Sequence, residues 1–172
     1  MAVGLVLAAC SGAMSLTEYA ESLEVAAVDE SVRFDPVVAT LNAMDTTLPE
    51  ARSAVKEAAV IVNDLHADLE ALDPPAELSD LHAVLLEHHR DLVTAQQEWA
   101  GNADAAQSVA ELLRSPEART AQSSNEAALE ACGRIQAALD ATAERAVFED
   151  VPWLPSELAE SIEVALGCPQ DT

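Results

Sequence analysis

Apolar residues recur at steps of three and four along most of the chain, which is the spacing of one face of an α-helix. Alternating runs of β-branched residues, which would favour strands, are missing from the sequence. In chain order, the predicted helices are Leu16–Met44, Leu48–Leu72, Pro75–Trp99, Ala103–Leu113, Pro116–Ala146 and Ser156–Leu166. The pattern therefore predicts an all-α protein.

Polar residues mark the starts of several predicted helices. Ser15 and Thr47 each stand three residues before a glutamate, the spacing of a capping box, in which two side chains satisfy two free amides. Further N-caps are predicted at Asp73, Ser115 and Ser156. These signals bound the helices without reference to any tertiary contact.

Proline is expected to interrupt the first helix. Pro36 follows Asp35 in its second half, and proline lacks the amide hydrogen that an inner helical position needs. We expect a kink there or a division into two helices. The pair Gly101–Asn102 is expected to end the third helix.

Four long helices with short connections predict an antiparallel up-and-down four-helix bundle. The proline-punctuated segment 151–155 and a short C-terminal helix are expected to fold back over it. The side chains of Phe148 and Trp153 are predicted to pack in the core. The predicted organisation is a single helical-bundle domain over 16–172, preceded by a short tether over 10–15.

The first ten residues form an apolar run that ends in Leu7-Ala8-Ala9-Cys10. This tetrapeptide resembles the lipobox of bacterial lipoproteins, in which the peptide is cut before the cysteine and its thiol carries a diacylglycerol. The resemblance implies a signal segment over 1–9 and lipid attachment at Cys10. It also implies an extracytoplasmic location on the cell membrane.

Two alternatives to this interpretation stay open. A secretory signal also has a basic n-region, yet the first basic residue is Arg33, which a start site upstream of Met1 would explain. Translation from Met14 would instead leave a cytoplasmic adaptor. Residues 2–9 are also compatible with the apolar end of an ordinary helix, and they are too short to span a bilayer.

The composition is strongly acidic, with 31 acidic and 8 basic residues and a net charge of −23. Such a field repels phosphate backbones, which argues against nucleic-acid binding. It also repels anionic headgroups, so membrane contact is expected through the lipid rather than through a basic face. A partner is expected to be another envelope protein.

Three cysteines are present in the chain. With Cys10 assigned to lipid, Cys132 and Cys168 remain, and two cysteines in an exported chain usually form a disulfide. This bridge would staple the C-terminal helix to the fourth predicted helix.

The order of these features along the whole chain also resembles that of a broader group of proteins. An acidic, alanine-rich domain follows the lipobox, with Leu-Asp-Pro-Pro-Ala-Glu-Leu at Leu72–Leu78 and a late cysteine in Leu166-Gly167-Cys168-Pro169. It resembles secreted or lipid-anchored helical proteins of unknown function from high-GC bacteria. The resemblance implies a fold and a location, and no activity.

The histidines offer a candidate metal site. His66 lies eight residues before Pro74 and His82 eight after it, so an antiparallel hairpin is expected to place both at a similar height. Glu70 lies one turn from His66, and two imidazoles with a carboxylate suit a divalent transition metal. The signal is weak, and boundary histidines satisfied by solvent or carboxylates are the favoured interpretation. No cofactor other than the covalent lipid is expected.

No catalytic motif stands out. The sequence has neither a Gly-x-Ser-x-Gly elbow nor a glycine-rich phosphate loop nor a Cys-x-x-Cys pair. We therefore predict a non-enzymatic interaction or scaffolding module of the cell envelope. The alternative is a protein that binds a metal or small ligand between His66 and His82.

Overall fold

The computed structural model describes residues 13–127 and 154–165, and all regular structure in these residues is helical. In chain order the elements are α1 (Leu16–Asn42), α2 (Leu48–Ala71), the 3₁₀ turn η1 (Ala76–Leu78), α3 (Ser79–Asn102), the 3₁₀ turn η2 (Ala103–Ala105), α4 (Val109–Leu113) and α6 (Leu154–Ala165). Residues 116–127 are also helical. The all-α prediction is confirmed.

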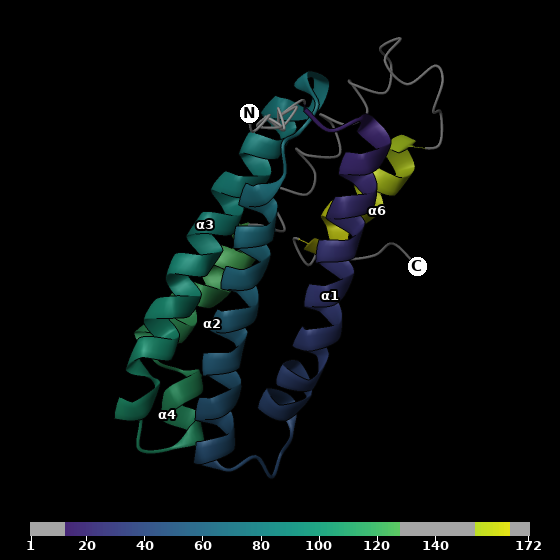
Figure 1. Cartoon of the computed structure of the whole chain (residues 1–172). Helices are drawn as coiled ribbons and strands as arrows, with labels where there is room; N and C mark the ends of the chain where they lie inside the picture. Colours follow the sequence, from purple (N-terminus) through teal and green to yellow (C-terminus); the bar gives the residue numbers. More distant parts are fainter. Residues whose placement is uncertain (1–12, 128–153, 166–172) are drawn as a thin grey trace, which may run out of the picture.

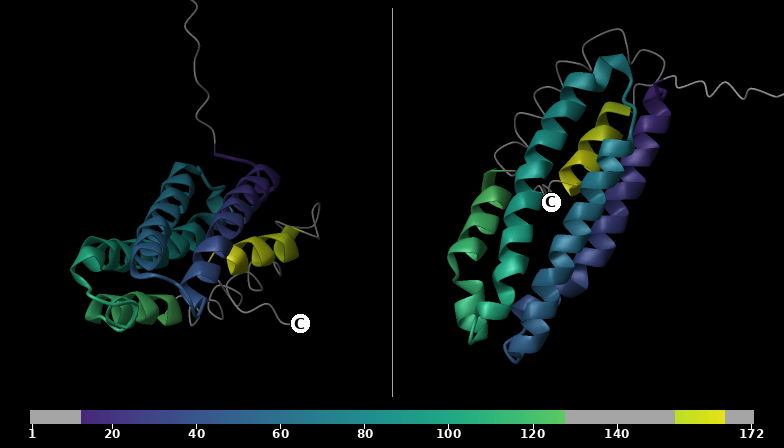
Figure 2. Two further views of the ribbon diagram at one scale, coloured as in Figure 1. Left: turned by 90° about the horizontal axis from the view of Figure 1, so that it is seen from below. Right: turned by 60° about the vertical axis from the view of Figure 1, so that its left-hand side comes forward.

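The long helices run side by side in chain order. α2 packs against both α1 and α3, and the connections alternate between the two ends of the molecule (Figure 1). Residues 116–127 run beside α3, while α6 packs against α1 (Figure 2). The remainder of the predicted fourth helix lies outside the described residues.

Two predicted capping boxes are confirmed. The Ser15 hydroxyl accepts a hydrogen bond from the Glu18 amide, and the Ser15 amide donates to the Glu18 carboxylate at 2.9 Å. Thr47 and Glu50 repeat the arrangement at the start of α2. Ser115 accepts from the amide of Ala118 at 3.0 Å, as predicted.

Two predicted caps are wrong. Asp73 caps neither η1 nor α3, because Pro75 occupies the position before η1 and Leu78 the position before α3. Ser156 lies inside α6, which begins at Leu154. Leu154 is fully buried and lies one turn before the buried Leu158, so the apolar stripe of α6 continues beyond the serine on its N-terminal side.

Pro36 does not divide α1, which is one helix from Leu16 to Asn42. Of the two outcomes expected here, a kink or a division, the division is therefore wrong. Pro36 removes the usual donor to the carbonyl of Val32, and both residues are exposed, so water is available to that carbonyl. The continuous α1 keeps a long outer face.

The largest core cluster lies at one end of the molecule, where α1, α2, α3 and α6 meet. Its fully buried large side chains are Tyr19, Leu23, Leu69, Leu78, Leu85, Leu154, Leu158 and Ile162. A second cluster joins α2 to η2 and α4 at the other end. Among the described helices, none has the length and apolar character that crossing a bilayer requires.

The start of α1 is tied to the α2–α3 connection. The Met14 amide donates a 2.9 Å hydrogen bond to the carbonyl of Asp73, and the Met14 side chain packs against the large cluster. Several predictions fall outside the described residues, namely those for Cys10, Cys132, Phe148, Trp153 and Cys168.

Candidate functional site

His82 is held in the core by a tyrosine from α1. The Tyr19 hydroxyl and His82 Nδ1 are 2.9 Å apart, and the two rings meet edge to face. Burial raises the pKa of Tyr19 far above its usual value, so its hydroxyl stays protonated. Burial also lowers the pKa of His82. A neutral His82 that accepts from Tyr19 satisfies both conditions.

His66 lies against His89 rather than against His82. The two rings are stacked with centroids 5.8 Å apart and planes 3° from parallel. His66 Nε2 approaches the Glu70 carboxylate at 3.5 Å, as its one-turn spacing predicts. His89 is fully buried, and neither of its ring nitrogens has a hydrogen-bond partner within the described part of the chain.

The predicted pairing of His66 with His82 is therefore wrong. His66 stacks on His89, and His82 lies seven residues from His89 on α3, which is about 10 Å along the axis. The prediction treated Pro74 as the midpoint of a symmetrical hairpin. The connection instead adds the turn η1 on the α3 side, which shifts the register toward His89.

The shifted register changes the chemistry of this region. Burial lowers the pKa of His89 to about 4, with a smaller contribution from the charge of His66. This ring is therefore neutral at physiological pH. Within 13–127 and 154–165, no group of three or more His, Cys, Asp or Glu side chains is placed to hold a metal ion. His66, His82 and Glu70 accordingly share no site.

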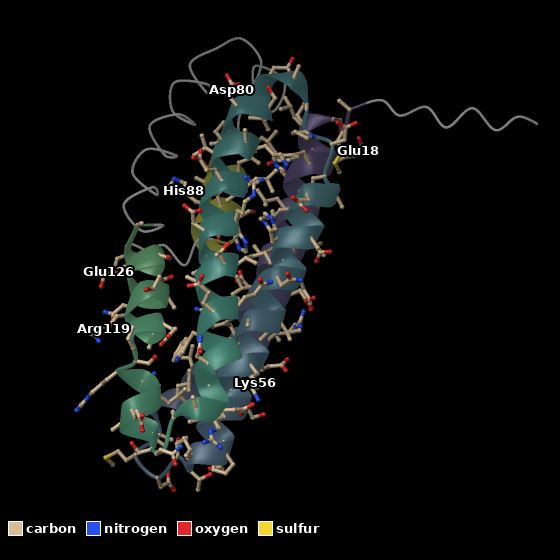
Figure 3. All side chains as sticks on the ribbon, turned by 90° about the vertical axis from the view of Figure 1, so that its left-hand side faces the viewer. Glu18, Lys56, Asp80, His88, Arg119 and Glu126 are labelled. Atoms are coloured by element: carbon tan, nitrogen blue, oxygen red, sulfur yellow. The ribbon has the colours of Figure 1, made fainter. Side chains whose placement is uncertain are left out.

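His88 points away from this interior. It lies on the side of α3 that faces residues 116–127 (Figure 3). With Asp91 it lines a shallow polar hollow whose opposite wall carries Arg119 and Ser123. Adjacent positions on a helix point about 100° apart, which explains why His88 and His89 have different surroundings.

A larger groove runs between α1 and residues 116–127, with α2 and α3 beneath it. Its volume is about 480 Å³. The lining residues that matter below are Glu30, Phe34, Asp35, Gln96, Trp99 and Ala121. The Trp99 ring is fixed by a 3.1 Å hydrogen bond from its Nε1 to the carbonyl of Leu112.

Two polar side chains in this groove have no hydrogen-bond partner among the described residues. Burial raises the pKa of Glu30 to about 8, against a smaller opposite effect of Arg33, and no hydrogen bond to this carboxyl exists among the described residues. The Gln96 side chain is buried, and its Oε1 is also unpaired there. Sequence reasoning missed Glu30, although an acidic residue between Ala27 and Phe34 on a buried stripe was a usable signal.

The outer face of α1 carries an apolar stripe. Val25, Val28 and Val32 are 70%, 51% and 66% exposed, and their spacing places them on one side of the helix. Exposed Pro36 and Ala39 continue the same line. We refer to these five residues as the valine stripe. It lies opposite the buried face that contains Leu23 and Ala27.

Comparisons with protein families, with curated proteins and with solved structures gave no match.

Proposed function

We propose that the protein is a lipid-anchored, extracytoplasmic interaction module of the cell envelope without enzymatic activity. The observation that carries this proposal is the valine stripe of α1. Three valines more than half exposed on one face of one helix form a contiguous apolar line, and such lines mark contact surfaces in otherwise charged proteins.

The surroundings of the stripe define the chemistry of the partner. Exposed Glu24 and Asp29 flank it on its two sides. The only basic residue of α1, Arg33, is paired with Asp64 at 2.8 Å and with Asp29 at 3.6 Å. A protein that presents an apolar ridge bordered by lysine or arginine complements this face.

The anchor supports contact close to the membrane. Cys10 lies four residues before Met14, and four residues reach at most about 14 Å. Since the Met14 amide is bonded to Asp73, a lipid on Cys10 keeps the α2–α3 end within that reach of the bilayer. The proposed fold is the four-helix bundle, with helix 116–146 as its fourth member and the C-terminal helix stapled by Cys132 and Cys168.

A photo-crosslinking experiment in the host envelope tests the interaction. A benzoylphenylalanine replaces Val28 in one strain and Val84 in another, because Val84 is also exposed but lies on α3. We expect a discrete cross-linked protein from Val28 only, and we expect Val25→Glu to remove it. Equal products from both positions, or none from Val28, would contradict the proposal.

Mass spectrometry of the protein from the host membrane, without reductant, tests the anchor. We expect a chain that starts at Cys10, carries lipid and lacks two hydrogens for the Cys132–Cys168 bridge. An unlipidated chain that starts at Met14 with free thiols would contradict the localisation and would indicate a cytoplasmic adaptor.

A further inference from the structure

The groove beside α1 has the features of a ligand site that the interaction function does not use. We propose that it binds a hydrophobic organic cation, with an ammonium group beside Glu30 and an apolar body between Phe34 and Trp99. The occupant is thus an amine with an alkyl or aryl tail. This site lies on a different side of α1 from the valine stripe and goes beyond the interaction function.

The walls of the groove fit an apolar body. Phe34 comes from α1, Trp99 from α3 and Ala121 from the helical residues 116–127, so the apolar walls come from segments far apart in the sequence. Because Trp99 is held by its bond to Leu112, its ring is preorganised as a flat surface. Burial of an alkyl chain of several CH₂ groups between these walls favours binding, because it removes apolar surface from water.

The charges of the groove select a cation. Glu30 and Asp35 are the ionisable side chains in its described lining, and both are acids. Arg33, the nearest cation on α1, has its guanidinium engaged by Asp64. No charged side chain of α2, α3 or residues 116–127 belongs to that lining. An anionic ligand would find no basic side chain within this described lining, whereas the net charge of −23 concentrates cations near the surface.

The unpaired polar groups supply the directional contacts. An ammonium group has N–H donors, and the Glu30 carboxyl in the lining has no hydrogen bond within the described residues. The buried Oε1 of Gln96, which also lines the groove, is unpaired there too. When the ammonium group binds beside a protonated Glu30, the Glu30 carboxyl must release its proton to solvent. The ligand keeps its own proton throughout, so each binding event at neutral pH delivers up to one proton to the buffer.

Calorimetric titration of the full 172-residue chain with octylammonium chloride tests the proposal. We expect octylammonium to bind at least tenfold more tightly than octanoate or octanol at pH 7. Repeating the titration in phosphate and in Tris, whose heats of ionisation differ, measures the released protons. Equal affinity for octylammonium and octanoate, or no binding of octylammonium at millimolar concentration, would overturn the proposal.

A matched pair of variants locates the site. Glu30→Gln keeps the shape of the side chain but has no proton to release, so we expect proton release to disappear and affinity to fall at least tenfold at pH 8. Glu21→Gln removes an exposed carboxylate of the same helix outside the groove and is expected to behave like the wild type. Equal behaviour of both variants would overturn the assignment.

A measurement on the wild-type chain covers the case in which Glu30→Gln fails to fold. The carboxyl carbon of Glu30 is titrated by NMR with and without octylammonium. We expect the midpoint of its titration to fall when the cation is bound. An unchanged midpoint at saturating octylammonium would exclude Glu30 from the site.

Discussion

Two buried histidines, seven residues apart on α3, differ in whether a described residue forms a hydrogen bond with them. His82 is 6% exposed and is joined to the Tyr19 hydroxyl. His89 is fully buried, and its neighbour His66 presents only the flat face of a ring. One imidazole therefore keeps a hydrogen bond in the core, while the other has no hydrogen-bond partner among the described residues.

The difference teaches that the partner, rather than burial itself, determines the energetic effect of a core histidine. A satisfied buried pair contributes roughly 1 kcal/mol, whereas a buried polar group without a partner costs about 1–3 kcal/mol. His82 is expected to stabilise the large core cluster, and His89 is expected to destabilise the middle of the bundle. Four predictions test this contrast, from the largest expected effect to the smallest.

The largest effect concerns the pH dependence of stability through His89. The pKa of His89 in the folded protein is about 4, below its usual 6.5. Between these two pH values, the unfolded chain therefore binds a proton that the folded chain does not bind. Stability is therefore lost as the pH falls from about 7 to 4, by about 3 kcal/mol in total. We expect urea denaturation of His89→Leu to lack this loss.

The comparison with the wild type isolates the contribution of His89. The raised pKa of Glu30 acts in the opposite sense, because stability that is present below pH 4.5 is lost as the pH rises through about 8. Glu30 is retained in both proteins and cancels in the difference. Parallel stability curves for the two proteins between pH 7 and 4 would contradict the prediction.

The next effect concerns the bond between Tyr19 and His82. Tyr19→Phe leaves Nδ1 of His82 buried without its partner, and we expect a loss of about 1–3 kcal/mol of unfolding free energy. His82→Leu should cost a similar amount, because the buried hydroxyl of Tyr19 is then unpaired. The double variant should be clearly more stable than the sum of the two losses implies, and strict additivity would speak against the bond.

A smaller effect is expected for His89→Leu at neutral pH. Leucine fills a similar space and removes two unpaired ring nitrogens, so the unfolding free energy should rise by about 1 kcal/mol. Thermal denaturation at pH 7.5 measures the change. A fall of the melting temperature would mean that His89 makes an interaction that leucine cannot replace.

The smallest effect is expected at Glu70. Its contact with His66 Nε2 is long, at 3.5 Å, and the Glu70 side chain is 56% exposed. Glu70→Gln should therefore change the unfolding free energy by less than about 0.5 kcal/mol, as is usual for exposed ion pairs. A larger loss would indicate that Glu70 orients the ring of His66 against His89.

The helix starts at Ser15 and Thr47 were predictable because a capping box involves only atoms within three residues of one another. The same holds for Ser115. The failures at Asp73 and Ser156 have a common cause, since the actual helix starts depend on the turn η1 and on the burial of Leu154. Local signals decide a boundary only where tertiary packing does not compete with them.

The sequence by itself determined the all-α character, the pattern of helices and the acidic surface, because spacing and charge are properties of the chain. Only the tertiary structure decided which side chains meet. The register between α2 and α3 pairs His66 with His89, and helix packing brings Glu30 into the same groove as Trp99. Such contacts depend on the length of a connection and on packing between distant segments, and neither is encoded within a few neighbouring residues.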